Sequence, residues 1–200
     1  MRWFRHTPLD TVRWVVLDCE TSGLDIACDR LLSVGAVAVG GGEVRLTDQF
    51  SALVRQETPS AAENILIHGI AGDAQRGGRP AQQVIAELAE YVAEGVPVAF
   101  HAPFDAGILR RHGLRLEREW VDLATLLPVL FPARAPRQNG LDPWLAAFEI
   151  PAHRRHDALG DAFATAQLLL PALKEMKRRR IDTVEALVKT ERDARWLARR

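Results

Sequence analysis

The chain has 200 residues, of which 48% are hydrophobic, and it carries 26 basic and 26 acidic residues. This length and composition suit a single domain with a sizeable core. The balanced charge excludes a bulk positive field that would attract nucleic acid from a distance, so a polyanionic ligand would need a local positive charge such as bound divalent cations.

Apolar runs rich in β-branched residues predict five strands, and the glycines at 40–42 suit a hairpin between the second and third. The predicted strands are 13–20, 31–39, 43–54, 96–100 and 120–123. Helical spacing of apolar residues predicts helices over 80–94, 104–112, 125–131, 141–148 and 157–180. An antiparallel meander followed by α/β alternation predicts an α/β fold with a mixed sheet flanked by helices.

The last 27 residues, 174–200, contain ten basic and five acidic residues. We expect them to form a basic helical extension behind a main domain of residues 1–173. The two interpretations of this extension are a solvated helix and a contact with phosphate or a partner.

Cellular location is suggested by the cysteines and by the absence of long apolar runs. Cys19 and Cys28 are the only cysteines, and neither has the spacing of a zinc site. The first residues lack a signal-peptide core, and no run approaches the roughly 18 apolar residues of a membrane span. We therefore expect a soluble cytoplasmic protein without membrane contact.

Acidic residues follow the first predicted strand. Asp18 and Glu20 are two positions apart at its end, so the period of a strand points both to one face. Two unpaired carboxylates at the end of a buried strand are costly unless a positive group meets them, and a divalent cation is the simplest such group. The alternative is an exposed strand end with incidental acids.

Two further acids occupy comparable positions. Asp105 follows the fourth strand, where a strand-to-helix loop would bring it to the same sheet edge. The alternative is a helix N-cap or a first-turn aspartate favoured by the helix dipole. Asp161 lies in the first turns of the last long helix, and His156 lies five residues earlier, where it can reach a metal-activated water. His156 is otherwise a surface histidine, and Asp157 is assigned as a helix N-cap.

Four segments, in order, carry a resemblance to a known family: D-C-E-T-S-G-L from Asp18, L-I-H-G-I from Leu66, A-P-F-D from Ala102 and H-D-A-L-G-D-A from His156. Over roughly 12–170 the chain resembles the DEDDh 3′→5′ exonucleases, and it looks closest to the proofreading epsilon-subunit branch of bacterial DNA polymerase III. The resemblance implies a ribonuclease H-like fold and two divalent ions, Mg²⁺ or Mn²⁺.

The resemblance also implies roles for individual residues. The implied metal ligands are Asp18, Glu20, Asp105 and Asp161. His156 would be the general base. The implied substrate contacts are Thr21, Ser22, Gly23, Leu24, His68, Ile70, His101 and Phe104. For Leu24 and Ile70, ordinary core packing is the alternative.

One segment departs from the family pattern. His101 stands where an asparagine is usual, and Phe100 replaces a common histidine. We expect the third metal ligand to function despite these changes, while contacts around the terminal sugar and phosphate differ.

The expected activity is release of nucleoside 5′-monophosphates from the 3′ end of single-stranded DNA. Two alternatives stay open at this point: an exoribonuclease acting on short RNA or RNA 3′ ends, and a non-catalytic module that binds nucleic acid or a polymerase. Partners would include single-stranded DNA or RNA 3′ ends, and a DNA polymerase or another replication or repair protein is a further candidate.

Overall fold

The computed structural model describes residues 7–151 and 155–197. Five strands form one mixed sheet in the order β3-β2-β1-β4-β5. Their bounds are β1 Trp14–Thr21, β2 Leu31–Gly40, β3 Glu43–Leu53, β4 Val96–Ala99 and β5 Val121–Asp122. The first three pair antiparallel, while β4 joins β1, and β5 joins β4, in parallel. The predicted meander followed by parallel strands is confirmed.

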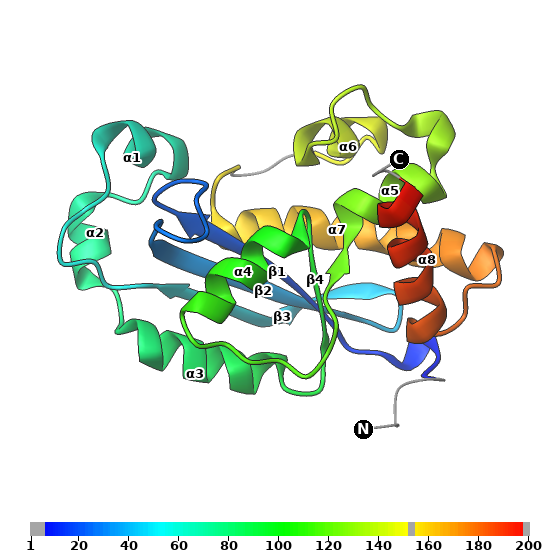
Figure 1. The fold of residues 1–200 in the computed structure, drawn as a ribbon, viewed down its shortest axis with the longest axis horizontal. Helices are drawn as coiled ribbons and strands as arrows, with labels where there is room; N and C mark the ends of the chain where they lie inside the picture. Colours follow the sequence, from blue (N-terminus) through cyan, green and yellow to red (C-terminus); the bar gives the residue numbers. More distant parts are fainter. Residues whose placement is uncertain (1–6, 152–154, 198–200) are drawn as a thin grey trace.

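Helices cover both faces of the sheet (Figure 1). Their bounds are α1 Ala62–His68, α2 Gly72–Gly77, α3 Ala81–Val92, α4 Ala102–Arg111, α5 Leu123–Leu130, α6 Leu141–Ala147, α7 Ala158–Arg178 and α8 Val184–Leu197. Short 3-10 turns lie at Leu9–Thr11 and Pro132–Arg134.

The strand alternation of β1 divides the core into two clusters. Val15 and Leu17 point to the face covered by α3 and α4, whereas Trp14 and Val16 point to the face covered by α7. All four side chains are almost completely buried. Residues 18 and 20 continue the second series, so they lie at the edge of the face that α7 covers.

The C-terminal helices pack on the same body. α7 runs without interruption across residues 173 and 174. α8 contacts α5 and β5, and its Leu187 is completely buried in the core on the α7 side of the sheet. At least part of the predicted extension is therefore integrated with the sheet and its helices.

Candidate active site

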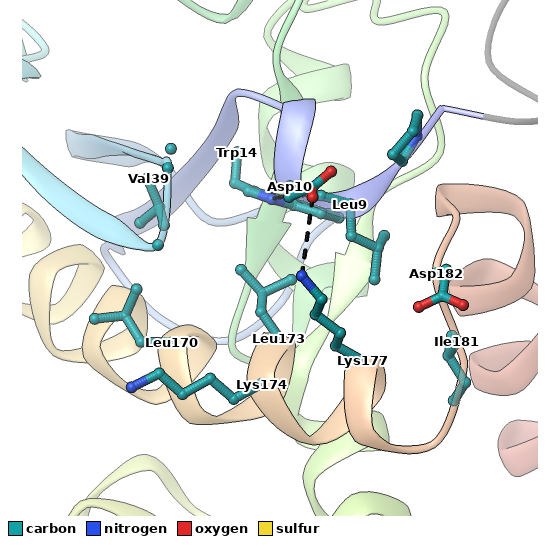
Figure 2. A pocket seen from close by; sticks show the side chains of 14 residues that line it. Leu9, Asp10, Trp14, Val39, Leu170, Leu173, Lys174, Lys177, Ile181 and Asp182 are labelled. Atoms are coloured by element: carbon teal, nitrogen blue, oxygen red, sulfur yellow. Dashed lines mark hydrogen bonds and ion pairs between the residues drawn. The ribbon is translucent and has the colours of Figure 1, made fainter.

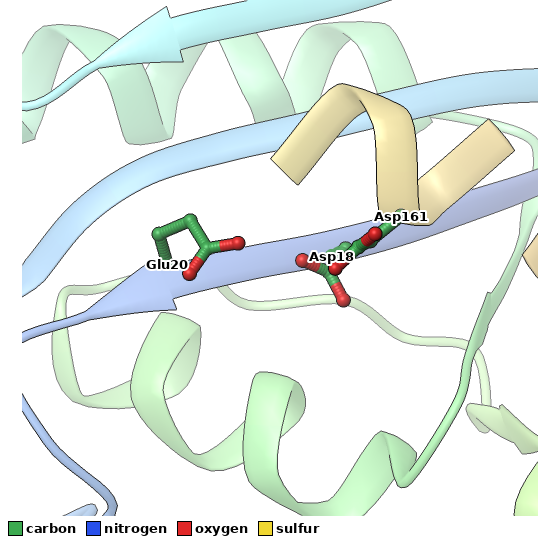
Figure 3. A group of neighbouring side chains, drawn as sticks. All are labelled: Asp18, Glu20 and Asp161. Carbon is green, nitrogen blue, oxygen red and sulfur yellow. The ribbon is translucent and has the colours of Figure 1, made fainter. Parts of the chain in front are cut away.

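Three carboxylates converge where β1 ends and α7 begins. Asp18 and Glu20 come from β1 and Asp161 from the first turn of α7 (Figure 3). Each offers an oxygen, and these oxygens lie within 4.8 Å of one another. The structure thus joins residues separated by about 140 positions in the chain.

The start of α7 is fixed by its own sequence. Asp157 is the N-cap, and its carboxylate accepts a hydrogen bond of 2.9 Å from the amide of Gly160. This cap places Asp161 in the first turn of the helix. The assignment of Asp157 as N-cap is confirmed.

A glycine in β2 lets α7 approach the sheet this closely. Gly35 pairs with Asp18 across the β1–β2 ladder. A Cβ atom at Gly35 would lie 2.2 Å from the backbone of Ala158 and Leu159. Only a residue without a side chain therefore allows Asp161 to reach the level of Asp18.

Asp105 lies beside this group rather than within it. It is in the first turn of α4 and is 4% exposed. Burial raises the pKa of Asp105 to about 7, while the Cys19 thiol opposes that rise. The Asp105 charge, after burial, is the largest contributor that raises the pKa of Asp18. The two carboxyl groups are therefore electrostatic neighbours.

The surroundings of the acidic group disfavour the ionised form of its carboxyl groups. Burial, followed by repulsion from the neighbouring carboxylates, raises the pKa of Glu20 to about 7 and that of Asp18 well above its usual range. The pKa of Asp161 is also raised, mainly by burial. Crowded carboxylate oxygens of this kind are the donors that Mg²⁺ and Mn²⁺ prefer, so the donor set fits such ions.

One cationic side chain already meets the acids. The guanidinium of Arg155 forms ion pairs with Asp161 and with Asp142 of α6. Its charge opposes the rise in the pKa of Asp18, Glu20 and Asp161. Arg155 therefore supplies part of the positive charge that the carboxylates require.

His156 lies next to the acids on exposed backbone. Its amide donates a hydrogen bond of 3.1 Å to Oδ2 of Asp161. Its φ of 61° is in the left-handed region, which few side chains adopt. This unusual conformation and the amide contact tie the position of His156 to that of Asp161.

The T-S-G-L segment after β1 is a closely hydrogen-bonded turn. The Thr21 hydroxyl donates to the Gly23 carbonyl at 2.6 Å, and the Ser22 hydroxyl donates to Asp29 at 2.8 Å. A Cβ atom at Gly23 would lie 2.5 Å from the Asp29 carboxylate. Leu24, at the tip, is 87% exposed, so it is available for contact with a ligand.

The H-G-I segment closes α1. His68 is buried, and its Nδ1 accepts a hydrogen bond of 2.9 Å from the amide of Ile70. Nε2 must then carry the proton, which it donates to Asn64 at 2.8 Å. The Asn64 amide in turn donates to the Thr21 carbonyl at 3.2 Å. His68 therefore connects α1 and Ile70 to the end of β1.

The third predicted contact region lies where β4 passes into α4. His101 is exposed, adopts a φ of 64°, and has its Nε2 3.2 Å from the Asn139 carbonyl oxygen. Phe104 is partly buried against the core on the α3 and α4 side. This region thus offers an exposed polar group at His101, while Phe104 packs partly against the core.

Comparison with known proteins gives the family. A family model for exonucleases, RNase_T, matches residues 15–169. The chain belongs to the DEDD family of 3′→5′ exonucleases. The membership of the DEDD exonuclease family that the sequence resemblance indicated is therefore confirmed.

Two curated relatives of the chain carry DNA polymerase III names. The chain is 33% identical over 189 residues to a DNA polymerase III subunit epsilon-like protein of Rhodobacter capsulatus, covering 92% of the chain and 27% of that protein. It is 31% identical over 176 residues to the PolC-type DNA polymerase III of Bacillus subtilis, covering 85% of the chain and 12% of that protein. The chain thus spans only a minor part of each relative.

Solved structures share the fold of this chain. Escherichia coli Exonuclease I in complex with a dT13 oligonucleotide superposes with a TM-score of 0.70 at 17% identity, covering 84% of this chain and 42% of that one. Exonuclease X in complex with 5′ overhanging duplex DNA superposes with a TM-score of 0.69 at 23% identity, covering 89% and 99%. The predicted ribonuclease H-like fold is confirmed.

The sequence alone missed three features of this acidic site. Gly35 carried a signal, since a glycine within a run of buried strand residues often marks a close backbone approach. Arg155 and Asn64 carried none, because an arginine or asparagine in a polar segment is common. Their contacts with Asp161 and Thr21 arise only from the tertiary structure.

A pocket lies at the opposite end of β1 from the acids. This pocket has a volume of about 480 Å³ between the start of β1, the β2–β3 turn and the end of α7 (Figure 2). Leu9, Trp14 and Leu173 line it, and Lys177 lies 4.0 Å from Asp10 at its rim. The clustered acids do not line this pocket.

Among the described residues, no helix is both long and apolar enough to cross a membrane.

Proposed function

We propose that the chain is a 3′→5′ exonuclease that removes nucleoside 5′-monophosphates from the 3′ end of single-stranded DNA. The observation that carries this proposal is the convergence of Asp18, Glu20 and Asp161 within 4.8 Å in a member of the DEDD family. Asp105, buried beside Asp18, is the proposed fourth acid.

The four acids would hold two divalent ions, Mg²⁺ or Mn²⁺, which would activate the attacking water and stabilise the charge on the phosphate. The carboxylates are suited to this task because burial and mutual repulsion raise their pKa values, so a cation is a favourable partner. Gly35 and the Asp157 cap hold Asp161 opposite Asp18.

His156 is the proposed base that takes the proton of the attacking water. Histidine suits this role because an imidazole nitrogen can accept and release a proton under mild conditions. Its backbone contact with Asp161 would keep the imidazole near the acids, and its exposure would allow the proton to pass to solvent.

The proposed substrate-binding surface comprises the turn after β1, the end of α1 and the start of α4. Leu24 presents an exposed apolar side chain, which suits contact with a base regardless of its sequence. Single-stranded DNA is favoured because the curated relatives are named as DNA polymerase III proteins, and because a structural neighbour was solved with a dT13 oligonucleotide. Association with a DNA polymerase is a further proposal from the same relatives.

The test uses DNA and RNA oligomers of one sequence, each with a free 3′ hydroxyl, with and without Mg²⁺ or Mn²⁺. We expect metal-dependent stepwise shortening of the DNA, at higher kcat/KM than for the RNA. Asp161→Asn, which preserves the shape of the side chain but removes a charged ligand, should reduce the rate by at least about 10²-fold. Faster turnover of RNA would favour the exoribonuclease, and binding without cleavage would favour the non-catalytic module.

His101 is the residue to vary for sugar selectivity. It lies at the start of α4, and a site with a polar group facing the 2′-hydroxyl would favour RNA. His101→Asn should therefore change the ratio of DNA to RNA turnover more than it changes the rate on the better substrate. Equal effects on both substrates would contradict a role in sugar selectivity.

A further inference from the structure

We infer that α8 positions one side of the active site, through a buried chain of contacts from Glu191 to Asp122 and from Asp122 to the start of α4. This inference deepens the proposed exonuclease function and rests on it. It assigns to a helix outside the 15–169 family match a task in arranging Asp105.

Asp122, the last residue of β5, joins two helix starts. It is 4% exposed, and its Oδ1 accepts from the amides of His101 at 3.0 Å, Ala102 at 3.3 Å and Ala124 at 3.1 Å. Its Oδ2 accepts from the Thr125 hydroxyl at 2.7 Å. One carboxylate therefore caps its own helix, α5, and also receives two amides from the start of α4.

The start of α4 has no cap of its own. The N-cap residue His101 is in the left-handed region and makes no side-chain capping hydrogen bond. The first amides of a helix lack partners within the helix, so an acceptor from elsewhere is needed when they are buried. Asp122 supplies that acceptor. Because Asp105 lies in the first turn of α4, the contact also determines where the Asp105 carboxylate stands relative to Asp18.

Glu191 of α8 holds Asp122 in turn. Glu191 is 4% exposed and accepts a hydrogen bond of 3.2 Å from the backbone amide of Asp122. Arg195, one turn further along α8, forms an ion pair with Glu191 and lies 3.7 Å from Oδ2 of Asp122. One guanidinium is thus shared by two buried carboxylates.

Packing of α8 against the core does not by itself require a buried carboxylate at position 191. Leu187, one turn before Glu191, already anchors α8 in the core. Burying a carboxylate is costly, and a buried ion pair is often no more stabilising than an apolar side chain of similar size. A charged residue at 191 is therefore explained by the hydrogen bond that it makes to Asp122.

The experiment compares Glu191→Ala and Glu191→Gln with two control variants on the same helix. Glu185→Ala changes an exposed glutamate, and Leu187→Ala weakens the packing of α8 without touching Asp122. Hydrogen exchange of the His101 and Ala102 amides, which donate to Asp122, is measured in the metal-free protein. The kcat and KM are measured on a single-stranded DNA oligomer with Mn²⁺.

For Glu191→Ala, we expect exchange at the start of α4 to be about tenfold faster, since the acceptor of these amides becomes mobile. We expect kcat to fall about 10–100-fold with KM nearly unchanged, because a misplaced catalytic group affects the reaction more than binding. In Glu191→Gln the side-chain amide oxygen can still accept from the backbone amide of Asp122. This variant should therefore keep most of the wild-type protection from exchange and most of the wild-type kcat. Leu187→Ala should lower the thermal midpoint while kcat stays close to that of the wild type.

Wild-type exchange and kcat in a folded Glu191→Ala variant would overturn the inference, as would an equal loss of kcat in Leu187→Ala. If Glu191→Ala does not fold, Arg195→Ala tests the inference in its place. That arginine is partly exposed, and its loss leaves the carboxylates of Glu191 and Asp122 without their shared partner. Arg195→Ala should accelerate exchange at the start of α4, and behaviour equal to Glu185→Ala would overturn the inference. The exchange measurement requires no hydrolysis, so an inactive wild type would reject the proposed function separately.

Discussion

Gly35 of β2 stands opposite Asp18 of β1, at the point where the first turn of α7 rests directly on the strand backbone. In Gly35→Ala the new methyl group would lie 2.2 Å from the α7 backbone, so the helix must move and Asp161 with it. We expect Mn²⁺ affinity to fall, turnover to fall about 10²-fold, and stability to fall by about 1–3 kcal/mol.

Calorimetric titration with Mn²⁺, urea unfolding and the oligomer assay check this prediction. Gly77→Ala is the matched control, because a Cβ atom there meets nothing within 4 Å. A Gly35→Ala protein with wild-type Mn²⁺ affinity would show that α7 does not need to approach β2 so closely.

Arg155 competes with a bound cation for Asp161. Its guanidinium is paired with the Asp161 carboxylate that is expected to hold a metal ion. Arg155→Gln removes that competitor, so we expect the Mn²⁺ dissociation constant to decrease several-fold, as Coulombic competition at a partly buried site implies. Calorimetry checks this, with the exposed Arg137→Gln as control. Weaker Mn²⁺ binding in Arg155→Gln would mean instead that Arg155 is needed to hold the α7 start.

The stability of the metal-free protein should depend on pH in an unusual direction. The pKa of Glu20 and that of Asp105 are both raised to about 7 in the folded state. The folded protein therefore binds protons that the unfolded chain, with carboxyl pKa values near 4, does not. This stabilisation is fully present below about pH 4 and is lost as the pH rises through about 7.

We expect the free energy of unfolding to fall between about pH 5 and pH 8, by at most about 3 kcal/mol for each of the two groups. Urea unfolding in the presence of a chelator measures it. The double variant Glu20→Gln, Asp105→Asn should flatten the profile, and saturating Mn²⁺ should remove it by stabilising the ionised carboxylates. A metal-free protein that becomes more stable over this range would contradict the environment described for the two acids.

His156→Asn is the variant that isolates the proposed base. Asparagine tolerates the left-handed backbone of residue 156 better than alanine, so the loop conformation should be preserved. We expect kcat to fall by about 10²–10⁴-fold, the usual contribution of a general base, while Mn²⁺ affinity persists. Added imidazole should restore part of the rate. Loss of Mn²⁺ binding would instead indicate that His156 is a ligand or supports the site structurally.

The sequence by itself determined the strands of the meander and the shared face of Asp18 and Glu20. Buried β-branched runs such as residues 31–39 are unambiguous, and the period of a strand places Asp18 and Glu20 on one face. The capping signal at Asp157 also fixed the helix on which Asp161 is carried. These features follow from local spacing, so they could be predicted without knowing the partners of each segment.

The short helices α1 and α2 were not predicted, because six or seven residues do not form a stable helix alone. They depend on buried contacts between segments: Gln75 donates to the Ser60 hydroxyl and to the Ile70 carbonyl, both at 2.9 Å, and Asn64 reaches Thr21. Such stabilisation leaves no periodic pattern in the sequence.

Only the tertiary structure decided which groups complete the site. Arg155 meets Asp142 and Asp161, and Glu191 meets Asp122 across 69 positions of the chain. These are single contacts between segments that become neighbours when the sheet and its helices pack together. A local sequence pattern indicates the secondary structure that a segment favours. The position of a buried charge depends instead on the distant group that compensates the cost of its desolvation.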